Sequence, residues 1–330
     1  MTLPSPPIPA TASATGGPAL PRVAAHLGVL DEAALIGPCI AHLRAIGVSH
    51  LIVHDMGSND GTRDRLAAQA GHDLRVLHSH ADMPYDTLMA QVEGAVAMAG
   101  TDWGADWVLM LDADEFPLPA GGDIRPVLAR AGAAGADLVE MPRYNVVLGP
   151  DGPALPLPPA GVADHARILL YARALPDFRR RLERDPTLGW LRAVPLPKIA
   201  LRPGRTGALA DGGHDAAPAS PGAPLTRLRS DAVAIAHLAL SDWPRFARKV
   251  ANIRDMFARH DGRLPATFGW HWKRWAALDA AGMLRHEYDR SALDAAALAE
   301  LRARGDVQSV AELLAPASAS VSAAPTGGGG

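Results

Sequence analysis

An acidic group at positions 112–115 is the part of the sequence best suited to chemistry. An unbroken apolar run from Trp107 to Leu111 leads directly into Asp112, Asp114 and Glu115. Such a run, bounded by polar residues, predicts a fully buried strand of a parallel sheet. Carboxylates crowded at a strand end repel one another and resist burial unless a cation offsets their charge. Because Mg2+ takes one or two carboxylates together with the phosphate oxygens of a substrate, the pattern indicates a metal-dependent site for a phosphate-bearing ligand.

The same residues have a simpler interpretation as an acidic turn that caps a following helix, because Asp and Glu are common at helix starts. The rest of the first half favours the metal site. Strands are expected at residues 23–27, 51–53, 74–77, 107–111 and 138–141, and helices at 35–46, 63–70, 88–99 and 124–131. This alternation predicts an α/β fold with a mixed, mainly parallel sheet flanked by helices. Open sheets of this kind bind ligands just beyond the carboxyl ends of their strands.

The second half of the chain is less regular. Strands are expected at 168–171, 198–201 and 233–235, separated by Pro- and Gly-rich loops at 149–165 and 202–225. An amphipathic helix is expected at 243–260, and Ala- and Leu-rich helices at 289–314.

Composition excludes several classes of protein. The formal net charge of -3 over 330 residues gives no indication of nucleic-acid binding. No run of apolar residues is long enough for a transmembrane helix, and the N-terminus does not have the pattern of a signal peptide. Cys39, the single cysteine, excludes an internal disulfide and a thiolate zinc cluster. We therefore expect a cytoplasmic protein, with peripheral attachment at the inner membrane face as an alternative.

Two motifs resemble those of a known enzyme family. The turn from Asp55 to Thr62 is similar to the Asp-Asn-x-Ser-x-Asp-Gly-Thr turn of family-two-like glycosyltransferases with a GT-A fold. The triplet 112–114 resembles the Asp-x-Asp element of that family, and its extended form Leu-Asp-Ala-Asp-Glu-Phe resembles one branch in particular. Further parts of that branch match in order over residues 22–250, namely Asp31-Glu32, Ala45–Val48, Lys198, Gly212–His214, Ile235–His237 and Phe246–Lys249. The departures are Asp31 and Met56, each in place of the usual Asn, and the long loops.

The resemblance implies a division of the chain. It predicts a GT-A glycosyltransferase domain at 22–240 and a helical C-terminal extension at 241–314. Residues 1–21 and 315–330 are expected to be disordered tails, because their composition cannot bury a core.

The resemblance also implies an activity and roles for residues. The enzyme would move a sugar from a nucleotide-sugar donor, with a UDP-sugar favoured, to an acceptor that could be a glycan or a lipid-linked molecule. Asp114 would bind a divalent metal, Mn2+ or Mg2+, and Asp112 would contact the ribose or a metal-bound water. Asp55 would contact the nucleobase, and Lys198 is a candidate for neutralising the diphosphate. Ser58 and Asp60 are expected to have structural roles in their turn.

Two histidines are candidates for a further metal ligand. A neutral imidazole suits Mn2+ better than Ca2+. We prefer His237 to His214, because a strand end holds a ligand more rigidly than a Gly-rich turn does. Two ligand bonds of about 2.1 Å with some slack predict that His237 and Asp114 lie about 6–8 Å apart without metal.

Direct displacement with inversion, which the resemblance favours, needs a general base, usually Asp or Glu. Asp215, Glu140 and Asp164 are the candidates, with Asp215 slightly ahead. Two other functions stay open at this stage. One is a nucleotidyl or phosphoryl transferase on a Rossmann-like sheet, although no P-loop motif is present. The other is a catalytically degenerate binding module.

Overall fold

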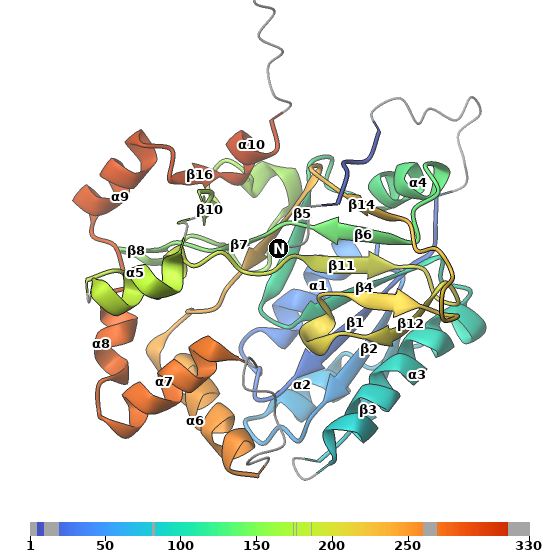
Figure 1. The fold of residues 1–330 in the computed structure, drawn as a ribbon, viewed down its shortest axis with the longest axis horizontal. Coiled ribbons are helices and arrows are strands. Elements are labelled where there is room, and N and C mark those ends of the chain that lie inside the picture. Colours follow the sequence, from blue (N-terminus) through green and yellow to red (C-terminus); the bar gives the residue numbers. More distant parts are fainter. Residues whose placement is uncertain are drawn as a thin grey trace, which may run out of the picture.

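The apolar runs of the first half assemble into a central mixed sheet (Figure 1). This computed structural model describes residues 5–9, 20–80, 83–173, 175, 177–185, 187–259 and 269–315. The strand order is β14-β6-β11-β4-β1-β2-β3. These strands are β1 (Val23–Val29), β2 (His50–Asp55), β3 (Leu74–His78), β4 (Trp107–Asp112), β6 (Leu138–Met141), β11 (Lys198–Leu201) and β14 (Arg227–Arg229). Only β11 runs antiparallel to its neighbours in this sheet, so the predicted mainly parallel α/β fold is confirmed.

Helices cover both faces of the sheet, as the alternation of elements predicts. One face packs against α1 (Ile36–Ala45), α2 (Thr62–Ala68) and α4 (Arg125–Ala133). The other face packs against α3 (Tyr85–Trp103) and the hairpin of β12 (Thr206–Leu209) and β13 (Ala216–Pro218). The apolar run of β4 is buried throughout because β4 lies inside the sheet, with helices on both sides.

The register of the parallel strands brings two predicted site residues to one edge. In β1, Val29 pairs with Asp55 of β2, and Gly28 pairs with Asp112 of β4. Both acidic residues therefore lie at the carboxyl ends of strands that flank β1. The predicted common edge is confirmed.

A second, smaller sheet extends from the acidic turn, in the order β5-β15-β7. Its strands are β5 (Glu115–Pro119), β7 (Arg143–Asn145) and β15 (Val233–His237). The sequence analysis left open a helix start after the acidic turn, and a strand is found there instead. The two prolines of β5 are tolerated because β5 is an edge strand of this sheet.

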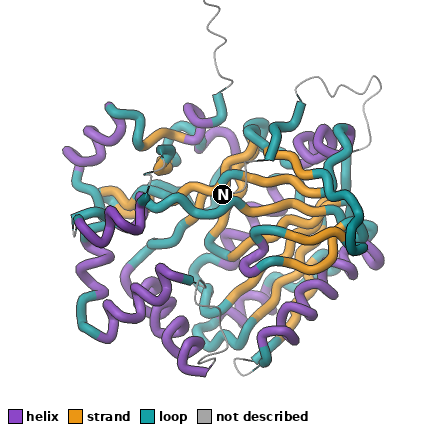
Figure 2. Tube along the Cα trace, in the orientation of Figure 1, coloured by secondary structure: helices purple, strands orange, loops and turns teal. Residues whose placement is uncertain are grey.

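The C-terminal part packs against the middle of the chain. Its elements are α6 (Trp243–Arg259), α7 (Trp270–Ala280), α8 (Leu284–Asp289), α9 (Ala295–Ala303), β16 (Val307–Ser309) and α10 (Val310–Leu313). Figure 2 shows that this part is mostly helical. It is not purely helical, because β16 pairs with β10 (Leu169–Tyr171). Phe246 and Trp275 share one apolar cluster with Trp190, so the extension is packed onto the α/β domain.

The two predicted loops contain short elements. In 149–165 these are part of the β8–β9 hairpin (Leu148–Gly149 and Gly152–Pro153) and the 3-10 turn η1 (Gly161–Asp164). In 202–225 they are the β12–β13 hairpin and η3 (Asp211–Gly213), whose glycine- and alanine-rich sequence has no clear period-two pattern. The helix α5 (Phe178–Arg184) and the turn η2 (Trp190–Arg192) complete the described elements.

The predicted N-terminal tail is partly ordered. Pro6 and Ile8 exchange backbone hydrogen bonds with Arg229 of β14, at 2.7 and 2.9 Å, because the edge of that strand has free donors and acceptors. Residues 1–4, 10–19 and 316–330 of the predicted tails lie outside the described residues. Within the described part of the chain, no helix has the length and apolar character needed to cross a membrane.

Candidate active site

The turn between β4 and β5 gathers the three carboxylates of the acidic motif. Asp114 is 2% exposed and Glu115 is fully buried, whereas the Asp112 side chain is 48% exposed. The turn is closed by the backbone N–H of Asp112, which donates to Glu115 Oε2 at 2.9 Å. Asp112 therefore faces solvent, and the other two carboxylates face the protein.

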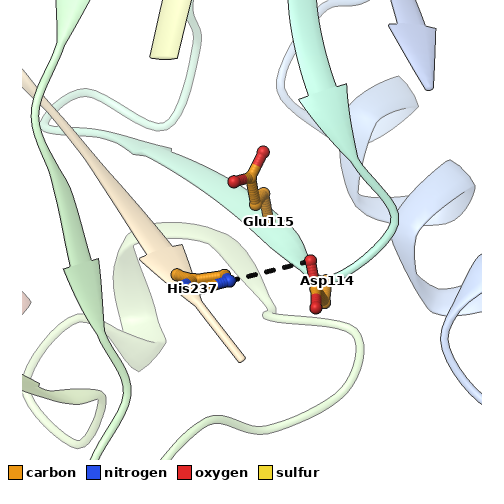
Figure 3. A group of neighbouring side chains, drawn as sticks. All are labelled: Asp114, Glu115 and His237. Carbon is orange, nitrogen blue, oxygen red and sulfur yellow. Dashed lines mark ion pairs between the residues drawn. The ribbon is translucent and has the colours of Figure 1, made fainter. Parts of the chain in front are cut away.

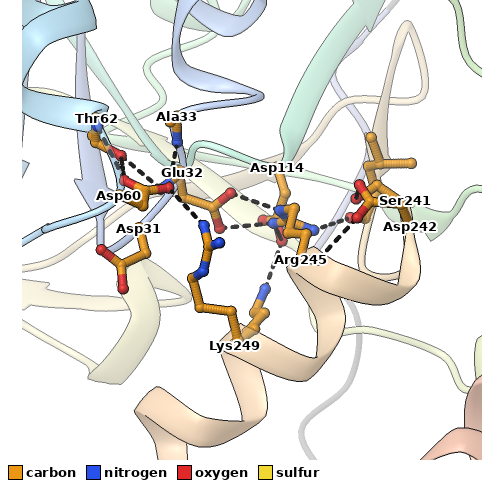
Figure 4. A network of polar contacts seen from close by, with 12 residues as sticks. Asp31, Glu32, Ala33, Asp60, Thr62, Asp114, Ser241, Asp242, Arg245 and Lys249 are labelled. Atoms are coloured by element: carbon orange, nitrogen blue, oxygen red, sulfur yellow. Dashed lines mark hydrogen bonds and ion pairs between the residues drawn. The ribbon is translucent and has the colours of Figure 1, made fainter.

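Basic side chains surround these carboxylates. Asp114 Oδ2 accepts hydrogen bonds from Lys249 Nζ at 2.6 Å and from Arg245 Nη2 at 2.9 Å (Figure 4). Among the described residues, four carboxylates contact four basic groups, namely Glu32, Asp112, Asp114 and Glu115 against Arg143, Lys198, Arg245 and Lys249. The crowded carboxylates are expected to need a cation, and these basic side chains supply part of that positive charge.

Arg245 links the acidic turn to the loop after β1. Its guanidinium donates to both carboxylate oxygens of Glu32 at 2.7 Å and to the Leu238 carbonyl at 3.1 Å. Helix α6 supplies both Arg245 and Lys249, and it is anchored by the fully buried Phe246 and Val250. The apolar face of α6 thus fixes the two cations against Asp114.

Lys198 is enclosed on the other side of the turn. Its ammonium donates to Asp112 Oδ2 at 2.8 Å and to the Gly212 carbonyl at 2.7 Å, and it lies 3.1 Å from Glu115 Oε2. Burial lowers the pKa of Lys198, but Asp112 and Glu115 outweigh this and raise it, so the group stays charged. Glu115 also pairs with Arg143.

The protonated nitrogen of the His237 ring can be assigned from its neighbours. Asn145 Nδ2 lies 3.0 Å from the carbonyls of Leu191 and of Ala193, so the amide must donate to them. Asn145 Oδ1 then accepts the hydrogen bond from His237 Nδ1–H at 2.7 Å. The lone pair of His237 is consequently on Nε2, which lies 4.0 Å from Asp114 Oδ1 (Figure 3).

The protonation states suit a metal site. Burial, reinforced by Arg143, holds the pKa of His237 well below its usual value, so the ring is neutral. Burial disfavours the charged form of Asp114, but Lys249 and Arg245 outweigh it and hold that pKa well below its usual value. A neutral imidazole and an ionised carboxylate are the forms that bind a divalent ion.

The geometry fits one ion between Asp114 and His237. Ligand atoms of Asp114, Glu115 and His237 all lie within 4.8 Å of one another. Metal–nitrogen and metal–oxygen bonds are about 2.1 Å, so one ion can span the 4.0 Å between His237 Nε2 and Asp114 Oδ1. The two cations contact Oδ2 of Asp114 and leave Oδ1 on the His237 side. Glu115 is a weaker ligand candidate because Arg143 and Lys198 already pair with it.

The separation of Asp114 and His237 is shorter than the predicted 6–8 Å. The reason is the antiparallel pairing of β15 with β5, which sets His237 directly opposite Glu115, next to Asp114. Lys249 and Arg245 also hold Asp114 in place, so its carboxylate does not swing away from the ring.

The turn after β2 uses its carboxylates differently. Asp55 is buried and accepts from the Ser58 backbone N–H at 2.9 Å and from Arg63 Nε at 2.7 Å. Asp60 accepts from the backbone N–H groups of Thr62 and Ala33 at 3.0 and 3.1 Å (Figure 4). These bonds fit the expected structural role of the turn, and they tie it to the loop after β1.

The other predicted site residues lie outside the Asp114–His237 pair. His214 Nδ1–H donates to the Pro197 carbonyl at 2.8 Å, and burial together with Lys198 lowers the pKa of His214 to about 4. Within the described residues, the group of possible metal ligands around Asp114 does not include His214. Asp215 pairs with Arg227, and Asp164 pairs with Arg167. Glu140 Oε1 accepts from Ser5 Oγ at 2.8 Å.

Sequence reasoning did not assign roles to Arg245, Lys249 or Asn145. Lys249 could have been found from the sequence, because the glycosyltransferase branch that this sequence resembles has a helix ending in Lys at this place. Arg245 and Asn145 lie 131 and 92 residues from their partners Asp114 and His237, and only the packing of α6 and the small sheet brings them together.

Comparisons with known proteins add little to this geometry. No family model matches the chain, and no curated protein matches it. Solved structures that are similar to part of it include the following three. Glucosyl-3-phosphoglycerate synthase from Mycobacterium tuberculosis with phosphoglyceric acid has 17% identity, covers 75% of this chain and 82% of that chain, and has a TM-score of 0.33. The same enzyme with Mn2+ and uridine-diphosphate-glucose has 16% identity, 75% and 81% coverage and a TM-score of 0.34. A mycobacterial protein has 17% identity, 72% and 74% coverage and a TM-score of 0.34. Similarity at this level supports no inference about this chain.

Proposed function

We propose that this chain is a metal-dependent glycosyltransferase that moves a sugar from a nucleotide-sugar donor, with a UDP-sugar favoured, to an acceptor hydroxyl. One observation carries the proposal. His237 Nε2 faces Asp114 Oδ1 at 4.0 Å, beside the half-exposed Asp112 at the carboxyl end of β4. A neutral imidazole and two carboxylates at a sheet edge form a donor set that suits Mn2+ or Mg2+.

In this proposal Asp114 and His237 hold the metal, and Asp112 approaches it or the ribose from the solvent side. A bound divalent ion would stabilise the negative charge of the leaving diphosphate. Lys249 is 26% exposed and next to Asp114, so it is the side chain best placed to contact the diphosphate. Lys198 remains a candidate for neutralising the diphosphate, and its main role in this proposal is to hold Asp112.

Asp55 is the candidate for the nucleobase contact. Its Oδ2 also lies 2.7 Å from Arg63 Nε and 3.3 Å from His78 Nδ1, and both of these side chains are exposed. A base that contacts this edge of the sheet would meet the three side chains together. Lys198 and Asp112 lie at the end of the neighbouring strands, where the ribose and diphosphate would follow.

The transfer itself is a single displacement. The acceptor oxygen forms a bond to the anomeric carbon of the sugar, and the bond from that carbon to the diphosphate oxygen breaks. Its electron pair leaves with the diphosphate, and the acceptor proton passes to a carboxylate base. Glu140 is preferred for this role over Asp215, because Glu140 lines a cavity next to Arg143 whereas Asp215 is paired with Arg227.

The experiment that tests this function is slow donor hydrolysis. Purified protein is incubated with UDP-, GDP- and CDP-sugars, with and without Mn2+, and release of the nucleoside diphosphate is measured. We expect release only with Mn2+ and fastest with a UDP-sugar. Absence of nucleoside diphosphate release with every donor would contradict the proposal.

A catalytically inactive binding module is the second candidate. The observation that favours it is the neutralisation of Asp114 by Arg245 and Lys249. Such a module would gain melting temperature from a nucleotide-sugar by mass action but would release no nucleoside diphosphate. The hydrolysis experiment therefore separates the two functions.

A further inference from the structure

A cavity of about 310 Å3 is lined by Arg143, which also pairs with Glu115 of the acidic turn. Its walls include Glu140, Arg143, Tyr144, Tyr171, Arg173 and Arg229. We infer that this cavity holds the acceptor and binds an anionic group of it, either a phosphate or a carboxylate. That the bound molecule is the acceptor rests on the proposed function, whereas the binding of an anion rests on the cavity alone.

The charge of the cavity wall favours an anion. Its lining residues include three arginines and one carboxylate, that of Glu140. Arg173 lies 3.5 Å from Asp306, and Arg229 lies 3.2 Å from Asp231, with both arginines substantially exposed. The Arg229–Asp231 pair is exposed on both sides and contributes little, so a ligand can replace it at small cost. Asp306 is buried, but it keeps Arg192 and Arg304 as partners when Arg173 contacts a ligand. The planar guanidinium fork matches phosphate and carboxylate oxygens in pairs.

Arg143 joins the cavity to the proposed metal site. Its guanidinium pairs with Glu115, and its side chain is only 11% exposed. Among the described residues its Nε has no hydrogen-bond partner although it is buried. A buried donor without a partner costs free energy. Arg143 lines the cavity and also pairs with Glu115, so an anion that binds to this guanidinium would lie beside the acidic turn. The acceptor would then lie next to the Asp114–His237 pair.

Glu140 gives the cavity a place for a hydroxyl group. Its Oε1 accepts a hydrogen bond from Ser5 Oγ at 2.8 Å, so a hydroxyl can approach this carboxylate as an acceptor hydroxyl would. Tyr144 and Tyr171 provide ring surface in the same wall. The cavity thus fits a hydroxylated molecule that carries an anionic group.

The test uses inorganic phosphate and acetate as separate probes of the full-length protein by isothermal titration calorimetry. The variant Arg173→Gln/Arg229→Gln removes two cations from the cavity and leaves Arg143 in place. Its matched control is Arg179→Gln/Arg285→Gln, since these arginines are similarly exposed and pair with Glu183 and Asp289. We expect the cavity variant to bind at least one probe about tenfold or more weakly than wild type, and the control to bind it like wild type.

The two probes also identify the anion, because preference for phosphate or for acetate tells which group the acceptor carries. Failure of the wild type to bind either probe, or equal binding by the cavity variant, would overturn the inference. Donor hydrolysis with Mn2+ distinguishes this failure from that of the proposed function. We expect hydrolysis to be the same in wild type and in the cavity variant, and its loss in that variant would assign the cavity to the donor and overturn the acceptor site. Phosphate binding through these arginines without any donor hydrolysis would keep the anion site and contradict the proposed function.

Discussion

Two acidic turns lie at the same edge of the central sheet but use their carboxylates in opposite ways. In the turn from Asp55 to Thr62, the carboxylates of Asp55 and Asp60 accept hydrogen bonds from backbone N–H groups. In the β4–β5 turn, the Asp114 carboxylate contacts, among the described residues, the side chains of Arg245, Lys249 and His237, although the neighbouring Glu115 accepts from the Asp112 backbone N–H. Backbone donors hold the first turn, mostly through its own loop, whereas the second turn is held by side chains of helix α6, far away in the sequence. The backbone partners of Asp60 and the side-chain partners of Asp114 therefore distinguish the structural aspartate from the candidate metal ligand.

The largest effect is expected from Asp114→Asn. Loss of this charge should lower donor hydrolysis by a factor of about 100 or more, the scale for removing a preorganised electrostatic group. The change should also destabilise the protein by about 3 kcal/mol, because Arg245 and Lys249 lose a buried partner. Nucleoside diphosphate release and urea unfolding measure the two effects. If the folded variant kept near-native turnover, Asp114 would not be part of the metal site.

His237→Ala tests the same turn without removing a charge from it, and urea unfolding checks that the variant is folded. If His237 binds the metal, we expect the Mn2+ concentration for half-maximal hydrolysis to rise by a factor of about 10 to 100, the range known for groups that support a metal site. The affinity for the nucleotide alone should stay unchanged, because Asp55 is untouched. If the variant had the same Mn2+ dependence as wild type, His237 would not bind the metal and would only be a structural partner of Asn145.

Asp60→Ala tests the opposite assignment for the structural turn. Asp60 accepts hydrogen bonds from Ala33 and Thr62, so its removal should cost about 2 kcal/mol of unfolding free energy. Hydrolysis by the folded variant should change less than about threefold, because no metal ligand is lost. Both quantities are measured as for Asp114→Asn. A loss of activity as large as that of Asp114→Asn would contradict the purely structural role of Asp60.

The smallest effect is expected from His26→Leu, in the strand between the two turns. Burial lowers the pKa of His26 from 6.5 to about 3, so below pH 6.5 the unfolded chain binds a proton that the folded protein does not. Stability should therefore fall as the pH decreases from 6.5, by up to about 2 kcal/mol at pH 5 from this residue. Urea unfolding at pH 7 and pH 5 should show a correspondingly smaller decrease for His26→Leu, with unchanged Mn2+ dependence. Equal decreases of unfolding free energy in wild type and His26→Leu would contradict the lowered pKa of His26 in the folded protein.

Much of the fold could be predicted because it depends on local patterns. The apolar run before Asp112 predicts β4, and parallel order places Asp55 and Asp112 at one edge. The strand β5 was not predicted, because Pro117 and Pro119 argue against a strand unless it is known to lie at a sheet edge.

The candidate site was predicted only in part. His237 follows a strand pattern and is found next to Asp114. The cations around Asp114 could not be predicted, because Arg245 reaches it through the packing of α6. The pairing of Asp215 with Arg227 likewise depends on the β12–β13 hairpin, in a segment that has no readable period.

Binding of Mn2+ in the presence of UDP, measured by electron paramagnetic resonance, tests most directly that the β4–β5 turn is the metal site. The free Mn2+ signal is titrated against wild type, Asp114→Asn and Asp60→Ala, each checked for folding. We predict that wild type and Asp60→Ala bind one Mn2+ per chain, and that Asp114→Asn binds none in the same concentration range. Equal Mn2+ binding by wild type and Asp114→Asn would contradict the assignment of the metal site to this turn.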